Sequence, residues 1–195
     1  MAFAAYAENR LNTKISNERR ESNMLMAEET RMKLNEVLTH SFLLNMICDN
    51  LVYEIDYNVY PLTSELVHES FAHHWPAVAD EWSNLAISLN AKPVRAGIDY
   101  DRHDHNGDLA EIFKEMLLAT EAYRRHVIEL ITVAELNDDV EVKIRGEELL
   151  AQMMPYRKQV DIWAQKAEEY RGNYKSFDAR IRSFTTQIPV LPDTK

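Results

Sequence analysis

Acidic and imidazole side chains gather in one stretch of the sequence, between residues 63 and 90. Glu65-Leu-Val-His68 is a Glu-x-x-His pair, and Glu69 follows it directly. Glu69 and His73 form a second pair four residues apart, and Asp80 comes about two helical turns later. Residues three or four apart share a face of a helix, so a carboxylate and an imidazole at these spacings can bind one metal ion. We therefore treat these five residues as candidate metal ligands on a predicted helix.

The ligand types narrow the choice of metal. Carboxylate oxygens combined with imidazole nitrogens suit iron, with manganese or zinc as alternatives. A centre that holds two iron ions needs carboxylates, because they offset the charge of the cations and can bridge them. The competing interpretation is a solvated polar helix face, because a single Glu-x-x-His pair often occurs by chance.

Other polar residues give weaker indications. His103 and His105 fall in a polar run that we expect to be a solvated loop. Glu121 and His126 are five residues apart and do not share a helix face well. We expect the glutamates of the same stretch to be exposed; they are Glu115, Glu121 and Glu129.

The elements that must position these groups are four long segments with apolar residues at spacings of three and four. This pattern predicts amphipathic helices over about residues 23–57, 63–90, 108–136 and 140–170. The predicted core-facing residues are Leu34, Val37, Leu38, Leu44, Cys48, Leu51, Val52, Ile55, Val67, Phe71, Trp75, Val78, Trp82, Leu85, Ala86, Leu89, Leu109, Ile112, Phe113, Met116, Tyr123, Val127, Leu130, Ile131, Ala134, Leu149, Leu150, Met153, Val160, Trp163 and Ala167.

The connections between these helices predict the fold. Short connections follow the first and third helices, and a longer one, residues 91–107, follows the second. This arrangement is typical of an all-α, ferritin-like four-helix bundle with a long crossover between helices 2 and 3. Pro76 and Pro155 lie inside predicted helices, where we expect each to kink the helix or to shift its hydrogen bonding. Thr63 or Ser64 can cap the start of the second helix.

The two ends of the chain differ from its body. Residues 1–22 are expected to form a flexible N-terminal arm, residues 23–171 the four-helix bundle, and residues 172–195 a mobile C-terminal tail. The arm contains four basic residues, which are Arg10, Lys14, Arg19 and Arg20. Several copies of such an arm on one oligomer could bind DNA through multivalency, although a plain disordered arm is the alternative.

Composition restricts the function classes further. The net charge of −10 argues against a chain that coats nucleic acid with its whole surface, and it suits either attraction of cations or simple solubility. The single cysteine, Cys48, cannot form an internal disulfide and lies in an apolar helical stretch, which favours a reducing, cytoplasmic setting. The sequence shows no signal-peptide pattern and no run of membrane-spanning length.

Several segments resemble the Dps mini-ferritins, diffusely and over residues 34–170. Leu34-Asn35-Glu36-Val37-Leu38 is similar to the start of the first Dps helix, and Asp80-Glu81-Trp82 to the end of the second. Residues 134–139 resemble the turn between the third and fourth helices, and Trp163 lies where the family tends to have a tryptophan. The resemblance implies a hollow dodecamer that oxidises ferrous iron and stores the ferric product. Many members of the family also bind DNA through basic tails.

The resemblance also implies where iron would be oxidised. In Dps proteins the ferroxidase centre lies between two subunits and uses two histidines, two aspartates and a glutamate. Aligned from Asp80, those positions fall on Tyr53, Glu65, Glu69, Asp80 and Asn84. Only Asp80 matches outright, so either the centre has been rebuilt, with His68 or His73 as ligands, or ferroxidase activity has been lost. A ferritin-type centre inside one bundle is also incomplete, because the fourth helix contains no histidine.

Three functional hypotheses follow. The leading one is a Dps-like iron-storage cage that oxidises ferrous iron with hydrogen peroxide or oxygen and protects DNA against oxidative stress. The second is a structural or DNA-binding oligomer with a degenerate metal site. The third is an unrelated role on the same scaffold, because a fold does not fix a function.

Overall fold

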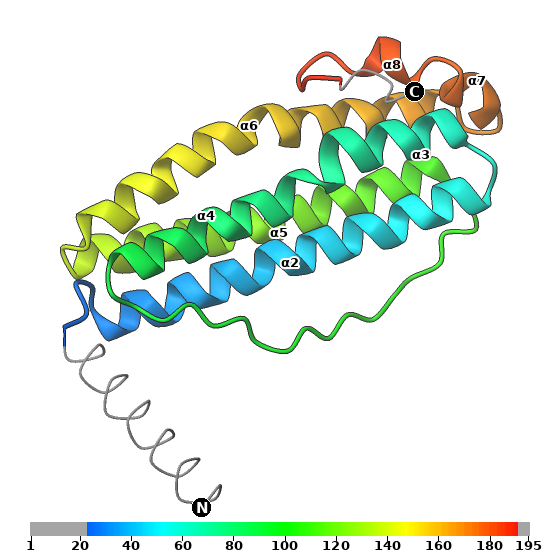
Figure 1. Cartoon of the computed structure of the whole chain (residues 1–195). Coiled ribbons are helices and arrows are strands. Elements are labelled where there is room, and N and C mark those ends of the chain that lie inside the picture. The colour runs from blue at the N-terminus through cyan, green and yellow to red at the C-terminus, as the bar shows by residue number, and fades with distance from the viewer. Residues whose placement is uncertain (1–22, 191–195) are drawn as a thin grey trace, which may run out of the picture.

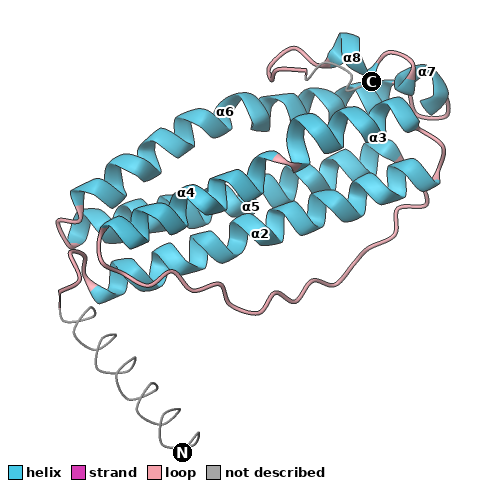
Figure 2. Ribbon diagram, in the orientation of Figure 1, coloured by secondary structure: helices cyan, strands magenta, loops and turns pink. Residues whose placement is uncertain are grey.

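The computed structural model describes residues 23–190 and shows a bundle of four long helical rods with two short helices at one end (Figure 1). No strand occurs in this part of the chain (Figure 2). The helical elements are α2 (Glu28–Tyr57), α3 (Pro61–Val67), the π-helix η1 (His68–Ala72), α4 (His74–Ser88), α5 (Leu109–Leu136), α6 (Val140–Glu169), α7 (Tyr174–Asp178) and α8 (Ile181–Phe184). None of these helices combines the length and apolar character that a membrane span requires.

Hydrogen bonds at the two ends of the bundle fix its topology. At one end, Leu25 N–H donates to the carbonyl of Leu89, and Ala27 N–H donates to the Asp139 carboxylate at 3.2 Å. The start of α2 therefore lies beside the end of α4 and the start of α6. At the other end, Gly107 N–H donates to Glu54, which places the start of α5 beside the end of α2. The segment between α4 and α5 must consequently return along the whole bundle, as Figure 1 shows, and the predicted long crossover is confirmed.

The core agrees closely with the predicted apolar stripes. The predicted core residues are buried, apart from three that are only partly buried, which are Leu85, Leu150 and Ile131. Aromatic side chains bridge η1 and α4 to α6: Phe71 of η1 lies 6.0 Å from Trp163 between ring centroids, and Trp75 of α4 lies 5.9 Å from Tyr156. Large rings fill this space where shorter side chains would leave cavities.

The second predicted helix, residues 63–90, is wrong as a single regular helix. It begins at Pro61, at a position where proline is well tolerated, and it is divided into α3, η1 and α4. Pro76 lies in the first turn of α4 and has no N–H to offer the carbonyl of Ala72. The side-chain amide of Asn45 on α2 donates to that carbonyl instead, at 3.3 Å. The expected shift of hydrogen bonding near Pro76 is thus present, whereas α6 continues through Pro155.

The expectation of a mobile C-terminal tail is wrong for residues 172–190. Three apolar side chains of this segment, Phe177, Ile181 and Ile188, are buried against the bundle. The Asp178 carboxylate accepts a 2.7 Å hydrogen bond from Thr63 N–H in the first turn of α3. The cap of α3 therefore comes from the tail, and not from Thr63 or Ser64. The predicted N-terminal arm, residues 1–22, lies outside the described residues.

Two glutamates hold the end of the crossover by hydrogen bonds, so the expectations of a solvated loop at His105 and an exposed Glu115 are wrong. Glu54, which is 4% exposed, accepts hydrogen bonds from the N–H groups of His105 and Gly107. Glu115 accepts a 2.6 Å hydrogen bond from the Tyr100 hydroxyl and lies 2.5 Å from His105 Nε2. His105 and Glu115 are therefore largely buried partners, whereas His103 is exposed as predicted.

Candidate metal centre

The π-helix η1 brings together two histidines that an α-helix would separate. Residues five apart on an α-helix differ in direction by about 140°, because each residue turns the helix by about 100°. In η1 the N–H of His73 bonds to the carbonyl of His68, five residues back, so one extra residue is absorbed in the turn. The rings of His68 and His73 consequently lie 4.1 Å apart between centroids.

The Glu69 carboxylate lies close to both rings. One carboxylate oxygen is 3.5 Å from His68 Nδ1, and the other is 3.6 Å from His73 Nδ1. Ligand atoms of all three residues lie within 4.8 Å of one another, a separation that a single metal ion can bridge after small side-chain rotations. The side chains of His68, Glu69 and His73 are 33%, 45% and 51% exposed, so the cluster is open to solvent on its outer side.

Asp49 on α2 approaches the same cluster from the neighbouring helix. Its Oδ1 lies 3.8 Å from His68 Nε2, the ring nitrogen that points away from Glu69. This oxygen is buried and has no hydrogen-bond partner. A carboxylate beside the second nitrogen of a metal-binding histidine favours the proton on that nitrogen and frees the other for the metal. Asp49, which the sequence patterns did not single out, is thus placed to orient His68.

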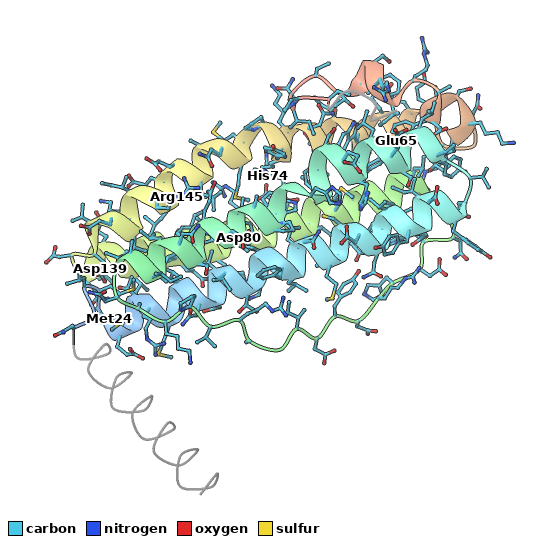
Figure 3. All side chains as sticks on the ribbon, in the orientation of Figure 1. Met24, Glu65, His74, Asp80, Asp139 and Arg145 are labelled. Carbon is cyan, nitrogen blue, oxygen red and sulfur yellow. The ribbon has the colours of Figure 1, made fainter. Side chains whose placement is uncertain are left out.

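The other predicted ligands lie outside this cluster. Tyr53 is exposed on α2, one turn beyond Asp49, and Glu65 is exposed on α3. Asp80 is exposed on α4, and Figure 3 shows it well separated from Glu65 along the bundle. One chain therefore brings together His68, Glu69 and His73 but not Tyr53, Glu65 or Asp80.

The interior of the bundle is occupied by a neutral hydrogen-bonded group. The Tyr123 hydroxyl on α5 is 2.8 Å from the Ser41 hydroxyl on α2 and accepts a 3.2 Å hydrogen bond from the Trp82 indole on α4. Burial raises the pKa of Tyr123 to about 12, so the phenol stays neutral at ordinary pH.

Buried carboxylates are found elsewhere. Within residues 23–190 they are Glu54, Asp139 and Asp178, and each accepts hydrogen bonds from backbone N–H groups near an end of the bundle. The described interior therefore offers no carboxylate pair to a metal.

Solved structures with a similar arrangement were found by comparison. A variant of PmFTN soaked in iron for 45 min matches with a TM-score of 0.71, and another PmFTN variant soaked overnight matches with 0.69. Each shares 16% sequence identity, over 78% of this chain and 99% of the other. The fold is ferritin-like. No protein-family model and no curated protein matches the sequence.

A second group of metal-binding side chains lies on another face of the ferritin-like bundle. Glu36 and His40 on α2 lie beside His126 on α5, all partly buried. The sequence spacing could have indicated two of the three residues, because Glu36 and His40 are four residues apart and share a helix face. The third residue, His126, joins them only through the packing of α2 against α5, which no local spacing reveals.

Proposed function

We propose that this chain is an iron-handling protein of the ferritin-like kind, which binds ferrous iron through His68, Glu69 and His73. The observation that carries the proposal is the π turn that gathers these side chains on a ferritin-like scaffold. Two imidazoles and one carboxylate, with coordination positions left open, form the ligand set that non-haem ferrous sites commonly use. Manganese and zinc are the alternative metals for the same ligands.

Oxidation of the iron requires more than one chain supplies at this cluster. Hydrogen peroxide takes one electron from each of two ferrous ions and, with two protons, leaves as two water molecules. The three ligands of one cluster hold one ion, so we propose that a second copy completes the centre across an interface. Either the exposed Asp80, or the exposed Tyr53 and Glu65 from the other end of the same face, would contribute from that copy, because Glu65 and Asp80 lie too far apart to reach one centre together. This intersubunit arrangement, and assembly into a dodecameric cage that stores ferric iron, agree with the Dps resemblance.

The direct test is anaerobic titration of the full-length chain with ferrous iron, followed by addition of peroxide. We expect the double variant H68A/H73A to lose ferrous affinity by at least about tenfold and to oxidise iron more slowly. His103→Ala is the matched control, because His103 is an exposed histidine of the crossover outside both clusters. Equal iron binding by all three proteins would refute the assignment. Light scattering on the same samples measures the molar mass and thus the number of subunits in the oligomer.

A structural or DNA-binding oligomer is the second candidate function. It is favoured by the described interior, where Tyr123, Ser41 and Trp82 stand in place of a carboxylate pair. DNA binding would depend on the basic residues of 1–22, since the chain as a whole carries a charge of −10. A gel shift across salt concentrations, with and without residues 1–22, tests this role, because phosphate contacts weaken steeply with salt. A cage that assembles but binds no iron would favour this candidate.

A further inference from the structure

The second cluster, formed by Glu36, His40 and His126, has the geometry of an independent metal site. The rings of His40 and His126 are stacked with their centroids 3.7 Å apart and an angle of 21° between them. Glu36 Oε1 lies 3.2 Å from His126 Nδ1. One ligand atom from each residue can be chosen so that all lie within 4.8 Å of one another.

The contact between Glu36 and His126 points to a shared cation. His126 Nδ1 is buried and makes no hydrogen bond, even though the Glu36 oxygen is only 3.2 Å away. Two ligands of a tetrahedral zinc ion, each about 2.0–2.1 Å from the metal, lie about 3.3 Å from each other. The observed separation is therefore the one expected for two ligands of one ion. We propose that Glu36, His40 and His126 bind a zinc ion between α2 and α5.

The charges around the cluster favour a cation. Glu129 on α5 contributes a second carboxylate, with Oε2 3.9 Å from His126 Nδ1, and can provide the fourth ligand. Lys33 is the opposing charge in direct contact, with its ammonium 2.9 Å from both Glu36 and Glu129, and Arg125 adds a weaker positive charge near Glu129.

Position, and not ligand type, distinguishes this site from the one at η1: both offer two imidazoles and a carboxylate, but this one lies between two packed helices. Two imidazoles and one carboxylate leave the fourth position of a tetrahedral zinc ion open, and the Glu129 carboxylate lies near enough to fill it. The histidines come from two packed rods, so the ion would link α2 to α5 in addition to binding locally. Binding must tilt the stacked rings apart, because a metal lies in the plane of each imidazole that it ligates.

The experiment uses the H68A/H73A variant of the full-length chain, so that the cluster at η1 cannot contribute. Titration with Co²⁺, a spectroscopic substitute for Zn²⁺, is expected to give the absorption of tetrahedral cobalt at one equivalent per chain, and Zn²⁺ is expected to abolish it. Adding His126→Gln or Glu36→Gln should weaken the metal affinity by at least about tenfold. Far-UV circular dichroism checks that each variant keeps its helices.

Lys33→Met provides a test in the opposite direction. Removing the competing ammonium should strengthen zinc binding by about three- to tenfold, because both carboxylates are released from their ion pairs. Lys143→Met is the matched control, since Lys143 also lies between two glutamates, Glu135 and Glu147, but away from the cluster. No cobalt absorption in H68A/H73A, or affinities unchanged by His126→Gln and Lys33→Met, would overturn the proposal. Neither result bears on iron binding at η1.

Discussion

The interior of the bundle and its surface at η1 differ in what their polar groups do: the interior groups stabilise the fold, and those at η1 are the candidate metal ligands. Inside, the Tyr123 hydroxyl is satisfied by Ser41 and Trp82, and the surrounding side chains are apolar or aromatic. At η1, Asp49 Oδ1 is buried without a hydrogen-bond partner, and Glu69 lies beside two imidazoles that are partly open to solvent. Satisfied groups rigidify a structure, whereas unsatisfied polar groups that converge are available to a ligand.

This contrast teaches that the bundle can retain its shape without metal ligands in its centre. Aromatic rings of η1 and α4 pack against α6 in this interior and contribute to its stability. The candidate ligands at η1 could then change without loss of the fold, because they contribute little to the packing. The three predictions that follow test this separation, beginning with the largest expected effect.

Substitution in the interior should cost the most stability and leave iron binding intact. Trp82 is 1% exposed and donates a hydrogen bond to Tyr123, so Trp82→Ala should lower the free energy of unfolding by about 3–5 kcal/mol. Urea unfolding measures the loss, and ferrous titration under native conditions should give an unchanged affinity. Trp82→Phe is the control that keeps most of the volume. A loss below about 1 kcal/mol for the alanine variant would contradict the assigned role of the interior.

Iron should stabilise the fold through the outer cluster alone. At a free ferrous concentration one hundred times the Kd, binding to the folded state adds about 2.7 kcal/mol to the free energy of unfolding. Anaerobic thermal unfolding should show this gain in the natural chain and in Trp82→Ala, but not in H68A/H73A, and a chelator should reverse it. An equal gain in H68A/H73A would place the bound iron elsewhere.

Acid should destabilise the boundary between the two regions through His74. Its ring stacks on Tyr156 with 4.0 Å between centroids, and burial lowers its pKa to about 4. An unfolded histidine takes up a proton near pH 6.5. Between pH 6.5 and 4 the unfolded state therefore binds more protons, and the free energy of unfolding falls as the pH falls. With a discount for partial exposure, the total loss is about 2 kcal/mol.

The variant His74→Phe isolates this effect, because phenylalanine keeps the stacking on Tyr156 without the titrating group. Urea unfolding in metal-free buffer at pH 7 and pH 4.5 should show a smaller acid loss for His74→Phe than for the natural chain. The same loss in both proteins would show that other groups govern the acid sensitivity.

The fold could be predicted from the sequence because its information is local and repeated. Each rod repeats an apolar stripe over many turns, so single errors do not change the assignment. Leu34, Phe113 and Trp163 are examples of stripe residues that are fully buried as expected. The long crossover also followed from composition, since breakers and polar residues collect between 91 and 107.

The features that escaped prediction depend on contacts between distant segments. The sequence around Phe177 suggests a tail, because nothing local shows that the bundle buries this ring. The cap from Asp178 likewise depends on the start of α3, which is distant in sequence. The candidate ligands show the same division. His68, Glu69 and His73 were found by spacing, although their convergence depends on a π turn. Asp49 and His126 join their clusters only through the packing of α2 against its neighbours.

The π turn at His68–Ala72 also bears on how the length of this chain can vary. Such a turn takes up one additional residue while the regular helices on both sides keep their facing, so Val67 and Trp75 stay buried on either side of it. A chain one residue shorter here could form a continuous helix over the same core and present a different set of side chains outward. Gain or loss of a single amino acid at this point would thus change which side chains face the solvent while the buried core of the bundle stays the same.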